Sequence, residues 1–412
     1  MTQPAIVIAA YNRPHSLNRL LTSIHNANYE QYSNISLVIS IDGGGPKEVL
    51  ELAHKFEWTN GEKTIVSHNE NIGLRQHIVS CGNLTETYGC VLLLEDDLFL
   101  STHFYDYAVK ATSFYQEETS IAGISLNNYL DNEYIDVPFC PLQNGYDAFF
   151  MQIPSSRGQV WTRKQWRKFK EFYNANPIIG NTDRLPESVK CWPESSWKKY
   201  YYKYMVDHDL YFVYPYCAHS SNFGDIGTHS KTNTAVFQVP LMNVRKEYAF
   251  PRLEESAVIY DAYLELLARC FWRMGVKIGV DFCVDLYGTK QLDLFINEYW
   301  LSTKDTSCPI ERFAIDLVPM ENNILLGFRG DEVSFGRREH FGKNVDANLY
   351  DKISCQYNTV AYDNGYRQGY RNGVGTSKTT ITYRIGHYLL YPLRLFKKTI
   401  TRQSTQIGST PT

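Results

Sequence analysis

The chain has 412 residues, a formal net charge of -3 at pH 7 and 43% hydrophobic residues. This length predicts two or three domains, and the apolar fraction is enough for a full core, which excludes wholesale disorder. The nearly neutral charge gives no signature of a nucleic-acid-binding protein. The nine cysteines form no CxxC pair and no zinc-ligand spacing, so we expect reduced, structural thiols in a cytoplasmic protein.

The first hundred residues alternate between strand-like and helix-like patterns. We expect strands at residues 5–10, 36–41, 63–67 and 90–94. Between them we expect helices that begin at Pro14, at Pro46 and near Gln76. This β-α-β-α-β-α-β order predicts an α/β fold with a doubly wound, mostly parallel, Rossmann-like sheet.

The fourth expected strand runs directly into three carboxylates, Glu95, Asp96 and Asp97. Ligands bind outside the carboxyl ends of strands in open α/β sheets, and three adjacent acids repel one another when ionised. A divalent cation would neutralise that repulsion, and oxygen ligands suit Mg²⁺ or Mn²⁺. The sequence therefore predicts a metal-dependent site here, and the alternative is a solvated acidic turn.

The chain continues with a mixed pattern of helices and strands. We expect a helix at residues 104–115, strands at 121–126 and 210–214, and an amphipathic surface helix within 160–172. The following elements are a polar, glycine-containing loop at 220–230, which could act as an active-site lid, a helix at 255–274, and short strands with turns over 279–326.

The last fifty residues have a distinct composition. No acidic residue follows Asp363, whereas basic and apolar residues alternate as far as Arg402. We predict a basic amphipathic tail at 376–412 that binds an anionic membrane surface. The alternative is a helix packed on the protein's own core. No signal peptide and no apolar run of about 18 residues is present, so we expect a peripheral protein on the inner face of the cell membrane.

Five short motifs occur in an order that resembles the GT-A glycosyltransferases, over roughly residues 4–235. The resemblance is to bacterial family 2 enzymes and to the N-acetylglucosaminyltransferase I family. The motifs are Ala9-Ala10-Tyr11-Asn12-Arg13, Ser40-Ile41-Asp42-Gly43-Gly44, Leu93-Leu94-Glu95-Asp96-Asp97-Leu98, Trp192-Pro193-Glu194-Ser195-Ser196-Trp197 and Asn222-Phe223-Gly224-Asp225-Ile226-Gly227-Thr228-His229.

The resemblance implies a nucleotide-sugar donor, most simply a UDP-sugar, bound across the carboxyl edge of the sheet. Ala10 and Tyr11 would line this site, Asp42 would accept an N–H of the base, and Arg13 would pair with the base or a phosphate. A basic residue near the pyrophosphate is expected at Arg75 or His77, and the motif does not choose between them.

The acids take their expected roles from the same resemblance. Asp97 corresponds to the position that holds Mn²⁺ or Mg²⁺, and His229 would be a further metal or phosphate contact. Glu95 and Asp96 would contact hydroxyls of the ribose or sugar, or orient water on the metal. The ion would stabilise the departing diphosphate.

The expected general base is where this chain departs from the family. Relatives have an aspartate after the second tryptophan of the Trp-Pro motif, where this chain has Lys198. We favour Glu194 as the replacement, with the alternatives Asp183, Asp207 and Asp209. Trp161 and Trp197 could stack on sugar rings, or they could be core residues.

The sequence thus predicts an inverting, metal-dependent glycosyltransferase that acts on a surface-polysaccharide or lipid-linked glycan hydroxyl. The expected domains are a catalytic domain at 1–252, a smaller C-terminal α+β region at 253–375, and the tail. A glycine-rich loop after the first strand would suit a sugar-nucleotide pyrophosphorylase, but none is present. A degenerate transferase that only binds glycan or acts as a scaffold is the alternative, and Lys198 is its best support.

Overall fold

The computed structural model describes residues 2–227 and 234–356. The chain divides into two units, Met1–Tyr350 and Asp351–Thr412, and the helices and strands named below lie in the first. Among the described helices, none combines the length and the apolar character needed to cross a membrane. The predicted amphipathic tail at 376–412 lies outside the described residues.

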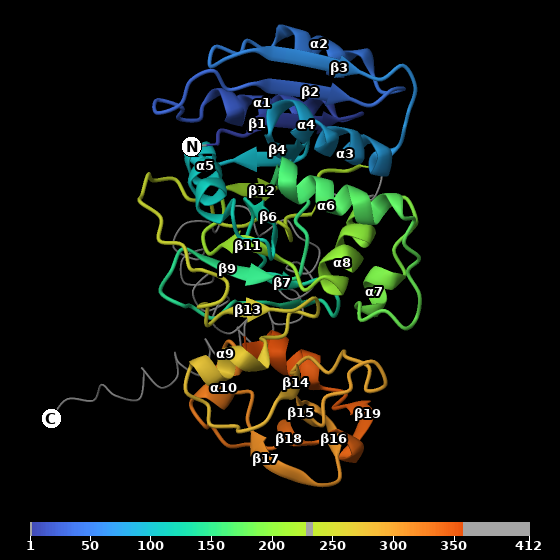
Figure 1. Cartoon of the computed structure of the whole chain (residues 1–412), viewed down its shortest axis with the longest axis vertical. Coiled ribbons are helices and arrows are strands. Elements are labelled where there is room, and N and C mark those ends of the chain that lie inside the picture. The colour runs from blue at the N-terminus through green and yellow to red at the C-terminus, as the bar shows by residue number, and fades with distance from the viewer. Residues whose placement is uncertain (1, 228–233, 357–412) are drawn as a thin grey trace, which may run out of the picture. The chain divides into compact units, whose positions relative to one another are not determined.

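A central sheet of nine strands forms the core (Figure 1). In spatial order, its strands are β3 (Lys63–Ser67), β2 (Leu37–Ile41), β1 (Ala5–Ala10), β4 (Cys90–Glu95), β10 (Gln159–Thr162), β6 (Ile121–Ser125), β11 (Tyr211–Pro215), β9 (Ala148–Met151) and β13 (Ile259–Tyr260). β10, β9 and β13 run opposite to the other six. The predicted α/β fold with a mostly parallel sheet is confirmed.

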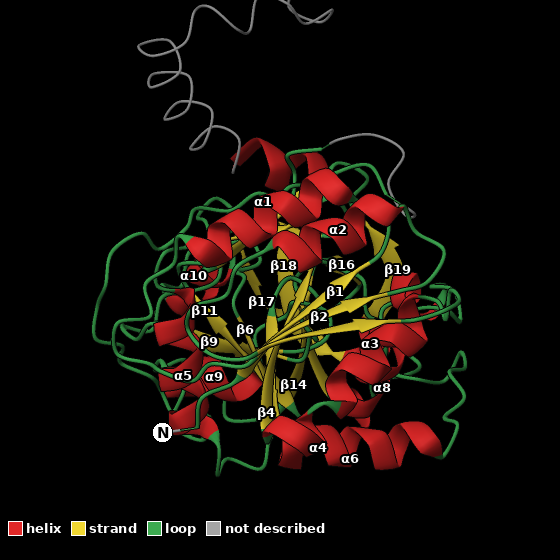
Figure 2. Cartoon of the chain, turned by 90° about the horizontal axis from the view of Figure 1, so that it is seen from above, coloured by secondary structure: helices red, strands yellow, loops and turns green. Residues whose placement is uncertain are grey.

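Helices cover both faces of this sheet, with α1 and α2 on one side and α4 and α6 on the other (Figure 2). Every residue of β1 and β2 is buried, as expected for parallel strands covered on both faces. The helices up to β11 are α1 (Pro14–His25), α2 (Lys47–Lys55), α3 (Leu74–Asn83), α4 (Thr85–Tyr88), α5 (Phe104–Tyr115), α6 (Arg163–Asn174), α7 (Glu187–Lys190) and α8 (Trp197–Asp207).

Strand β10 occupies the start of the segment that the sequence predicts as one amphipathic helix. The helix α6 begins only at Arg163, because Thr162 and Gln165 form a capping box. The preceding residues pair antiparallel with β4 and β6. The short strand β9 is likewise absent from the sequence prediction, since its four residues are all buried and show no alternation.

Two short antiparallel pairs lie outside the central sheet. The strand β5 (Leu98–Leu100), which follows the acids, pairs with β12 (Ser220–Asn222). This pairing brings the expected lid loop beside the acids, and the Phe223 N–H donates to the Asp97 carbonyl at 3.1 Å. The second pair is β7 (Asp131–Asn132) with β8 (Val137–Pro138).

The C-terminal region contains a second sheet, in the order β14 (Phe282–Asp285), β15 (Tyr299–Ser302), β18 (Val333–Arg337) and β17 (Pro309–Phe313). A further pair joins β16 (Lys304–Thr306) to β19 (Phe341–Val345). The helices are α9 (Ala268–Arg273), α10 (Glu321–Leu325) and the 3₁₀ turn Arg338–His340. The predicted mixture of short strands and turns is therefore confirmed.

The predicted helix at 255–274 is wrong. β13 joins the central sheet, and a tight turn follows in which the Asp261 carboxylate accepts the N–H groups of Tyr263 and Glu265 at 2.8 and 3.1 Å. Leu264 has a left-handed backbone with φ of 60°. Hydrogen bonds from a side-chain carboxylate to nearby backbone N–H groups compete with helix formation. Only Ala268–Arg273 (α9) of the predicted segment is an α-helix.

Candidate functional site

The carboxyl ends of β2, β1 and β4 lie side by side in the sheet and bring three of the motifs together. Ala9 pairs in register with Glu95, and the Asp42 N–H donates to the Ala10 carbonyl at 2.9 Å. The Tyr11 N–H donates to the Asp96 carboxylate at 3.3 Å. The segment after β1 therefore lies between Asp42 and the acids, as the parallel topology predicts.

Arg13 pairs with two of the three acids. Its Nη1 donates to Oδ2 of Asp97 at 2.9 Å, and its Nη2 bonds to Oδ1 of Asp96. The Asp96 side chain is 5% exposed and the Asp97 side chain 15% exposed. Burial raises the pKa of Asp96 to about 6, although Arg13 acts in the opposite direction. The guanidinium of Arg13 thus neutralises part of the negative charge of the acids, which the sequence analysis expected a metal ion to neutralise.

Glu95 is the acid without such a partner. Among the described residues, its side chain has no hydrogen bond or ion pair, and the residue is partly exposed. Burial, followed by the charge of Asp97, raises the pKa of Glu95 to about 8, and Arg13 opposes this shift. The edge of the sheet therefore presents a carboxyl group that is available to a hydroxyl and, once it loses its proton, to a cation.

Lys198 lies close enough to this edge for its charge to act on Glu95. Its Nζ donates to the Tyr129 hydroxyl at 2.9 Å and pairs with Glu133 at 3.5 Å. Burial alone would lower the pKa of Lys198, but Glu133 and Tyr129 raise it above its ordinary value. The position at which the motif resemblance places a base thus carries a cation in this chain, held by Tyr129 and Glu133, which the sequence did not indicate.

Asp42 is buried and is tied to the loop before α3. Its carboxylate accepts the N–H of Gly43 at 2.9 Å, of Ile72 at 2.9 Å and of Gly73 at 3.2 Å. A Cβ on Gly43 would lie 2.3 Å from the backbone of Glu70, so this glycine permits two loops to pack together. Asp42 therefore anchors the loop, and Oδ2, which accepts one of the three bonds, keeps a lone pair for a ligand.

The structure separates the two candidates for a basic group near the pyrophosphate. His77 is buried, shares a 2.8 Å hydrogen bond with Ser40 and has its pKa lowered by burial to about 4. A neutral, buried imidazole cannot supply a positive charge, so the expectation for His77 is corrected. Arg75 is partly exposed and donates to the Tyr200 hydroxyl at 3.2 Å.

Glu194, the expected base, lies in the same small network as Arg75. Its carboxylate accepts a 2.8 Å hydrogen bond from Lys199 and another from Tyr200, and its side chain is 73% exposed. The bonds from Lys199 and Tyr200 lower its pKa. Of the alternatives, Asp183 and Asp207 both pair with Lys203, and Asp209 bonds to Gln152 and Tyr211.

Both tryptophans expected to stack on sugars are core residues, which corrects that expectation. Trp161 is 0% exposed and stacks on Tyr201 at 5.6 Å, and Trp197 is 3% exposed with its ring edge-on to Trp161. Ala10 is also buried, at 1%. The faces of both indole rings are covered where α6 and α8 pack onto the sheet. A short sequence motif does not show whether its tryptophan will be covered in this way.

The loop after β12 packs against α1. The Asp225 carboxylate accepts a hydrogen bond from Ser16 at 2.7 Å and pairs with Arg19. A Cβ on Gly227 would lie 3.2 Å from Nη1 of Arg13, so the end of this described segment lies beside the acids. His229, the other predicted metal contact, lies outside the described residues.

The donor set at the edge suits a cation that also binds a diphosphate. Within residues 2–227 and 234–356, no three His, Cys, Asp or Glu side chains gather to hold a metal by themselves. Mg²⁺-type sites in nucleotide enzymes often use one or two carboxylates together with substrate phosphates and water. Asp97 has one oxygen on Arg13 and, within the described part of the chain, its Oδ1 has no hydrogen bond, so Asp97 as well as Glu95 keeps an oxygen for such an ion.

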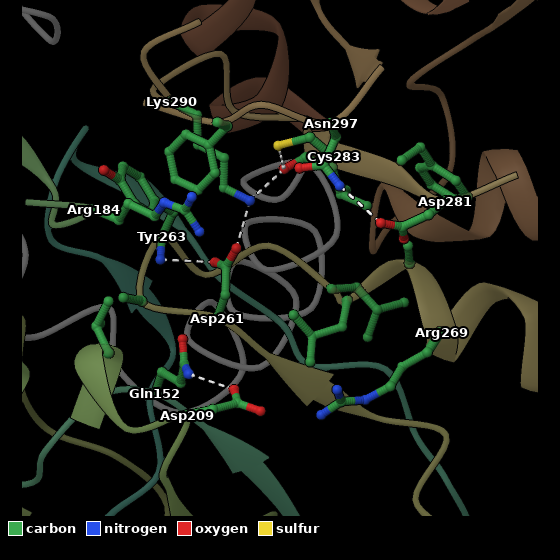
Figure 3. A pocket seen from close by; sticks show the side chains of 18 of the residues that line it. Gln152, Arg184, Asp209, Asp261, Tyr263, Arg269, Asp281, Cys283, Lys290 and Asn297 are labelled. Carbon is green, nitrogen blue, oxygen red and sulfur yellow. Dashed lines mark hydrogen bonds and ion pairs between the residues drawn. The ribbon is translucent and has the colours of Figure 1, made fainter. Parts of the chain in front are cut away.

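A cavity of about 580 Å³ lies elsewhere and includes none of these acids (Figure 3). It is lined by residues of β11, α9, β14 and the turn after β13. The described structure therefore contains two separate concentrations of polar side chains.

No family model matches the sequence, and no curated protein does. The structural comparisons find the resemblance that the motifs predict. A structure of GalNAc-T7 with UDP, GalNAc and Mn²⁺ matches with a TM-score of 0.38 and 13% identity, over 54% of this chain and 44% of that chain. TarS from S. aureus with UDP-GlcNAc matches with a TM-score of 0.35 and 13% identity, over 55% and 60%.

A cytidylyltransferase from Leptospira borgpetersenii also matches, with a TM-score of 0.27 and 13% identity, over 42% of this chain and 65% of that chain. This chain spans less than two thirds of each of the three proteins. At such TM-scores these likenesses carry no argument about activity, so the case for function rests on the residues at the sheet edge.

Proposed function

We propose that the chain is a nucleotide-sugar glycosyltransferase, inverting and metal-dependent, that transfers a hexosyl or N-acetylhexosaminyl group to a hydroxyl of a surface-polysaccharide or lipid-linked glycan. One observation carries the proposal. Arg13, Asp96 and Asp97 form a charged cluster at the carboxyl ends of β1 and β4, beside the buried Asp42 at the end of β2.

The nucleoside would lie across the ends of β1 and β2. Asp42 offers its remaining lone pair to an N–H of the base, and its three backbone bonds fix the carboxylate in place before the ligand arrives. A fixed acceptor loses little entropy on binding. Arg13 can move one of its forked N–H pairs from a carboxylate to a phosphate, which is the bidentate recognition that guanidinium groups favour.

The diphosphate would lie over the acids, where Asp97 would hold Mn²⁺ or Mg²⁺. The ion would supply charge neutralisation for the leaving group. Glu95 and Asp96 would bind hydroxyls of the ribose or sugar. Arg75 would contribute positive charge from the start of α3.

The acceptor hydroxyl must lose its proton as it attacks the anomeric carbon. Glu194 stays the proposed base because it is exposed and linked to Arg75 through Tyr200. The bonds from Lys199 and Tyr200 keep it ionised, and ligand binding must loosen at least one of them before the carboxylate accepts a proton. Glu194→Gln is therefore expected to lower kcat more than KM changes.

Turnover of UDP-, GDP- and CDP-sugars with Mn²⁺ tests the proposal. We expect at least one donor to be hydrolysed, and Asp97→Asn to lower kcat/KM by about 10²–10³-fold, the loss typical of one electrostatic contact to a developing charge. Asp331→Asn is the matched control, because Asp331 is 89% exposed in a surface pair with Arg312. Equal rates for Asp97→Asn and Asp331→Asn would contradict the assignment.

A second candidate function is supported by Lys198. A cation at the family's base position, paired with Glu133, fits a degenerate transferase that binds a nucleotide sugar or glycan without turning it over. Calorimetric titration with UDP and Mn²⁺ separates the two. Binding without hydrolysis of any donor would support this second function, and hydrolysis would exclude it.

The proposed location is the inner face of the cell membrane, with the basic segment at 376–412 as the contact. The sequence of this segment supports the proposal through Arg394, Lys397, Lys398 and Arg402. Flotation of the full chain with vesicles that contain anionic lipid is expected, and replacement of these four residues by glutamate should abolish it. Equal flotation of the two proteins would contradict the proposal.

A further inference from the structure

The 580 Å³ cavity lies at the edge of the central sheet opposite the acids. Gln152 follows the end of β9, which runs antiparallel to β11, and Tyr211 is the first residue of β11. β11 runs in the same direction as β4, so the cavity is at the amino-terminal edge and Glu95 at the carboxyl edge. Three strand spacings of about 4.8 Å also separate β4 from β11. The cavity is therefore not part of the proposed donor site.

The charged groups that line the cavity balance one another. They are Arg184, Arg269, Lys290, Asp209, Asp261 and Asp281, three cations and three carboxylates. The lining side chains have no excess of positive charge to favour a phosphate or a carboxylate, and an apolar ligand would leave these charged groups without solvent. The lining instead suits a neutral ligand that has many hydroxyl groups, since each hydroxyl both donates and accepts.

Several of these side chains keep hydrogen-bonding capacity. Asp261 is paired with Lys290, but Asp209 uses only Oδ1, for Gln152 and Tyr211, and Asp281 accepts from Asn297 at 2.9 Å. Figure 3 shows Arg184 and Arg269 on opposite sides of the space. In the described structure neither arginine pairs with a carboxylate.

Within the described structure, these two arginines make few hydrogen bonds. Arg184 donates to the Leu294 carbonyl at 3.1 Å, and Arg269 lies 3.4 Å from the Tyr211 hydroxyl. Because each guanidinium has five N–H donors, both retain donors for a ligand. Donors and acceptors therefore surround the cavity from several directions.

Aromatic rings complete the lining. Trp272 in α9 is 40% exposed, whereas most tryptophans of this chain are buried, and its ring contacts Phe282 edge-on at 6.2 Å. Tyr263 and Phe295 form a second edge-on pair at 5.5 Å. An exposed indole beside forked polar groups presents an apolar face for the C–H side of a sugar ring while the polar groups take its hydroxyls.

The turn that carries Asp261 and Tyr263 into the cavity has a strained backbone. Leu264 is buried with φ of 60°, a conformation that costs a leucine about 1 kcal/mol or more. Strain of this kind persists where the surrounding structure fixes it, and it gathers at ligand sites. Here the Asp261 carboxylate and the Asp261–Glu265 backbone bond at 2.9 Å hold the turn.

We propose that this cavity binds an uncharged, hydroxyl-rich segment of a glycan chain, with Trp272 as the stacking platform and Asp209, Asp281 and Arg269 as hydroxyl partners. The site would hold a polymer at a distance from the reacting end, because the two sites occupy opposite edges of the sheet. The binding does not require that the proposed transfer reaction occurs.

A glycan microarray with neutral and anionic oligosaccharides, probed with the full chain, tests the proposal. We expect retention on neutral glycans, and a loss of about tenfold in apparent affinity for Trp272→Ala and for Asp281→Asn, the size of effect that one stacking or polar contact gives. Two variants with the two changes on separate elements, α9 and the segment before β14, guard against a local folding defect. Thermal melts confirm that each variant is folded.

Two controls make the result specific. Tyr146→Ala removes an aromatic side chain that is 45% exposed and lies outside the cavity lining, and it should leave retention unchanged. Asp97→Asn should also leave it unchanged, which separates this site from the proposed donor site. Retention of anionic glycans alone, no retention of any glycan, or equal retention by folded Trp272→Ala and wild type would overturn the proposal, as would loss of retention in Asp97→Asn.

Discussion

Two groups of three carboxylates lie at or near the ends of buried strands, and their charges are compensated to different extents. At the sheet edge, Arg13 forms ion pairs with Asp96 and Asp97, while Glu95 has no hydrogen-bond partner among the described residues. In the C-terminal region, Asp261 pairs with Lys290 and Asp285 with Lys304. Glu265, the third acid, accepts the Tyr287 N–H at 2.8 Å.

The difference lies in how completely each charge is compensated. Asp285 also accepts the Lys290 N–H at 2.8 Å and the Ser302 hydroxyl at 2.9 Å, so both of its oxygens are hydrogen-bonded. Lys290 and Lys304 are buried beside these acids. A compensated network holds loops together, whereas an edge with spare carboxylate oxygens can accept a ligand. The cavity proposed for glycans borders the compensated network at Asp261 and Lys290. Its other walls carry Arg184 and Arg269, which pair with no carboxylate in the described structure.

Loss of a cation from the compensated network should give the largest effect. Lys290→Met removes the ammonium partner of Asp261 and the donor to the Val284 carbonyl, which leaves buried charge unpaired. We expect the free energy of unfolding to fall by about 3–5 kcal/mol. Lys164→Met is the control, because Lys164 and Glu117 form an exposed pair, and it should change stability by less than about 0.5 kcal/mol. Equal urea midpoints for the two variants would erase the contrast between the regions.

Arg13→Lys tests the sheet edge with the charge retained. A lysine cannot bond to Asp96 and Asp97 with one forked group, so the geometry of both carboxylates should loosen. We expect donor kcat/KM to fall by about 10–100-fold, measured by steady-state hydrolysis. Arg252→Lys is the control, because the Arg252 side chain is 51% exposed in its pair with Glu118, and it should not change donor kcat/KM. A wild-type rate for Arg13→Lys would show that the forked pairing has no role in turnover.

Asp42 holds a loop through three backbone hydrogen bonds and also keeps a lone pair for a ligand. Asp42→Asn tests how much of its role is structural. An asparagine has a single acceptor oxygen, so one or more of the three backbone N–H groups loses its partner. We expect about 1–3 kcal/mol of destabilisation. Amide hydrogen exchange should speed up at Ile72 and Gly73, which donate to this carboxylate. Unchanged protection of those two amides would assign Asp42 to ligand binding alone.

The effect of His77 should be confined to the acid limb of stability and absent at neutral pH. Its folded pKa of about 4 lies below the ordinary value of 6.5, so the unfolded chain binds more protons between these values. The stabilisation is complete above pH 6.5 and is lost as the pH falls toward 4. His77→Gln should therefore make the fall in stability shallower by about 1.4 kcal/mol per pH unit within that window. A parallel pH profile for the variant and wild type would mean that the pKa of His77 is the same in the folded and the unfolded chain.

Regular elements of the first 126 residues could be predicted because helix and strand periodicity are strong there. The strand β3 and the helix α5 match the predicted bounds at both ends. The segment 255–274 could not be predicted correctly, because its apolar spacing suits a helix. The Asp261 carboxylate instead accepts backbone N–H groups and stabilises a turn, and hydrophobic periodicity gives no sign of these bonds.

The site was predictable where topology decides and unpredictable where packing decides. The common edge of Asp42, Arg13 and the acids follows from strand order alone. The burial of Trp161 and the neutrality of His77 depend on which helices cover them. The pairing of Lys198 with Glu133 joins residues 65 apart, and no local pattern marks it.

A crystal of the chain soaked with UDP and Mn²⁺ would locate the proposed donor site. We expect nucleotide density across the ends of β1, β2 and β4, with the base at Asp42 and an anomalous manganese peak at Asp97. Nucleotide bound only in the cavity beside Asp261, or a manganese peak away from Asp97, would contradict the proposal.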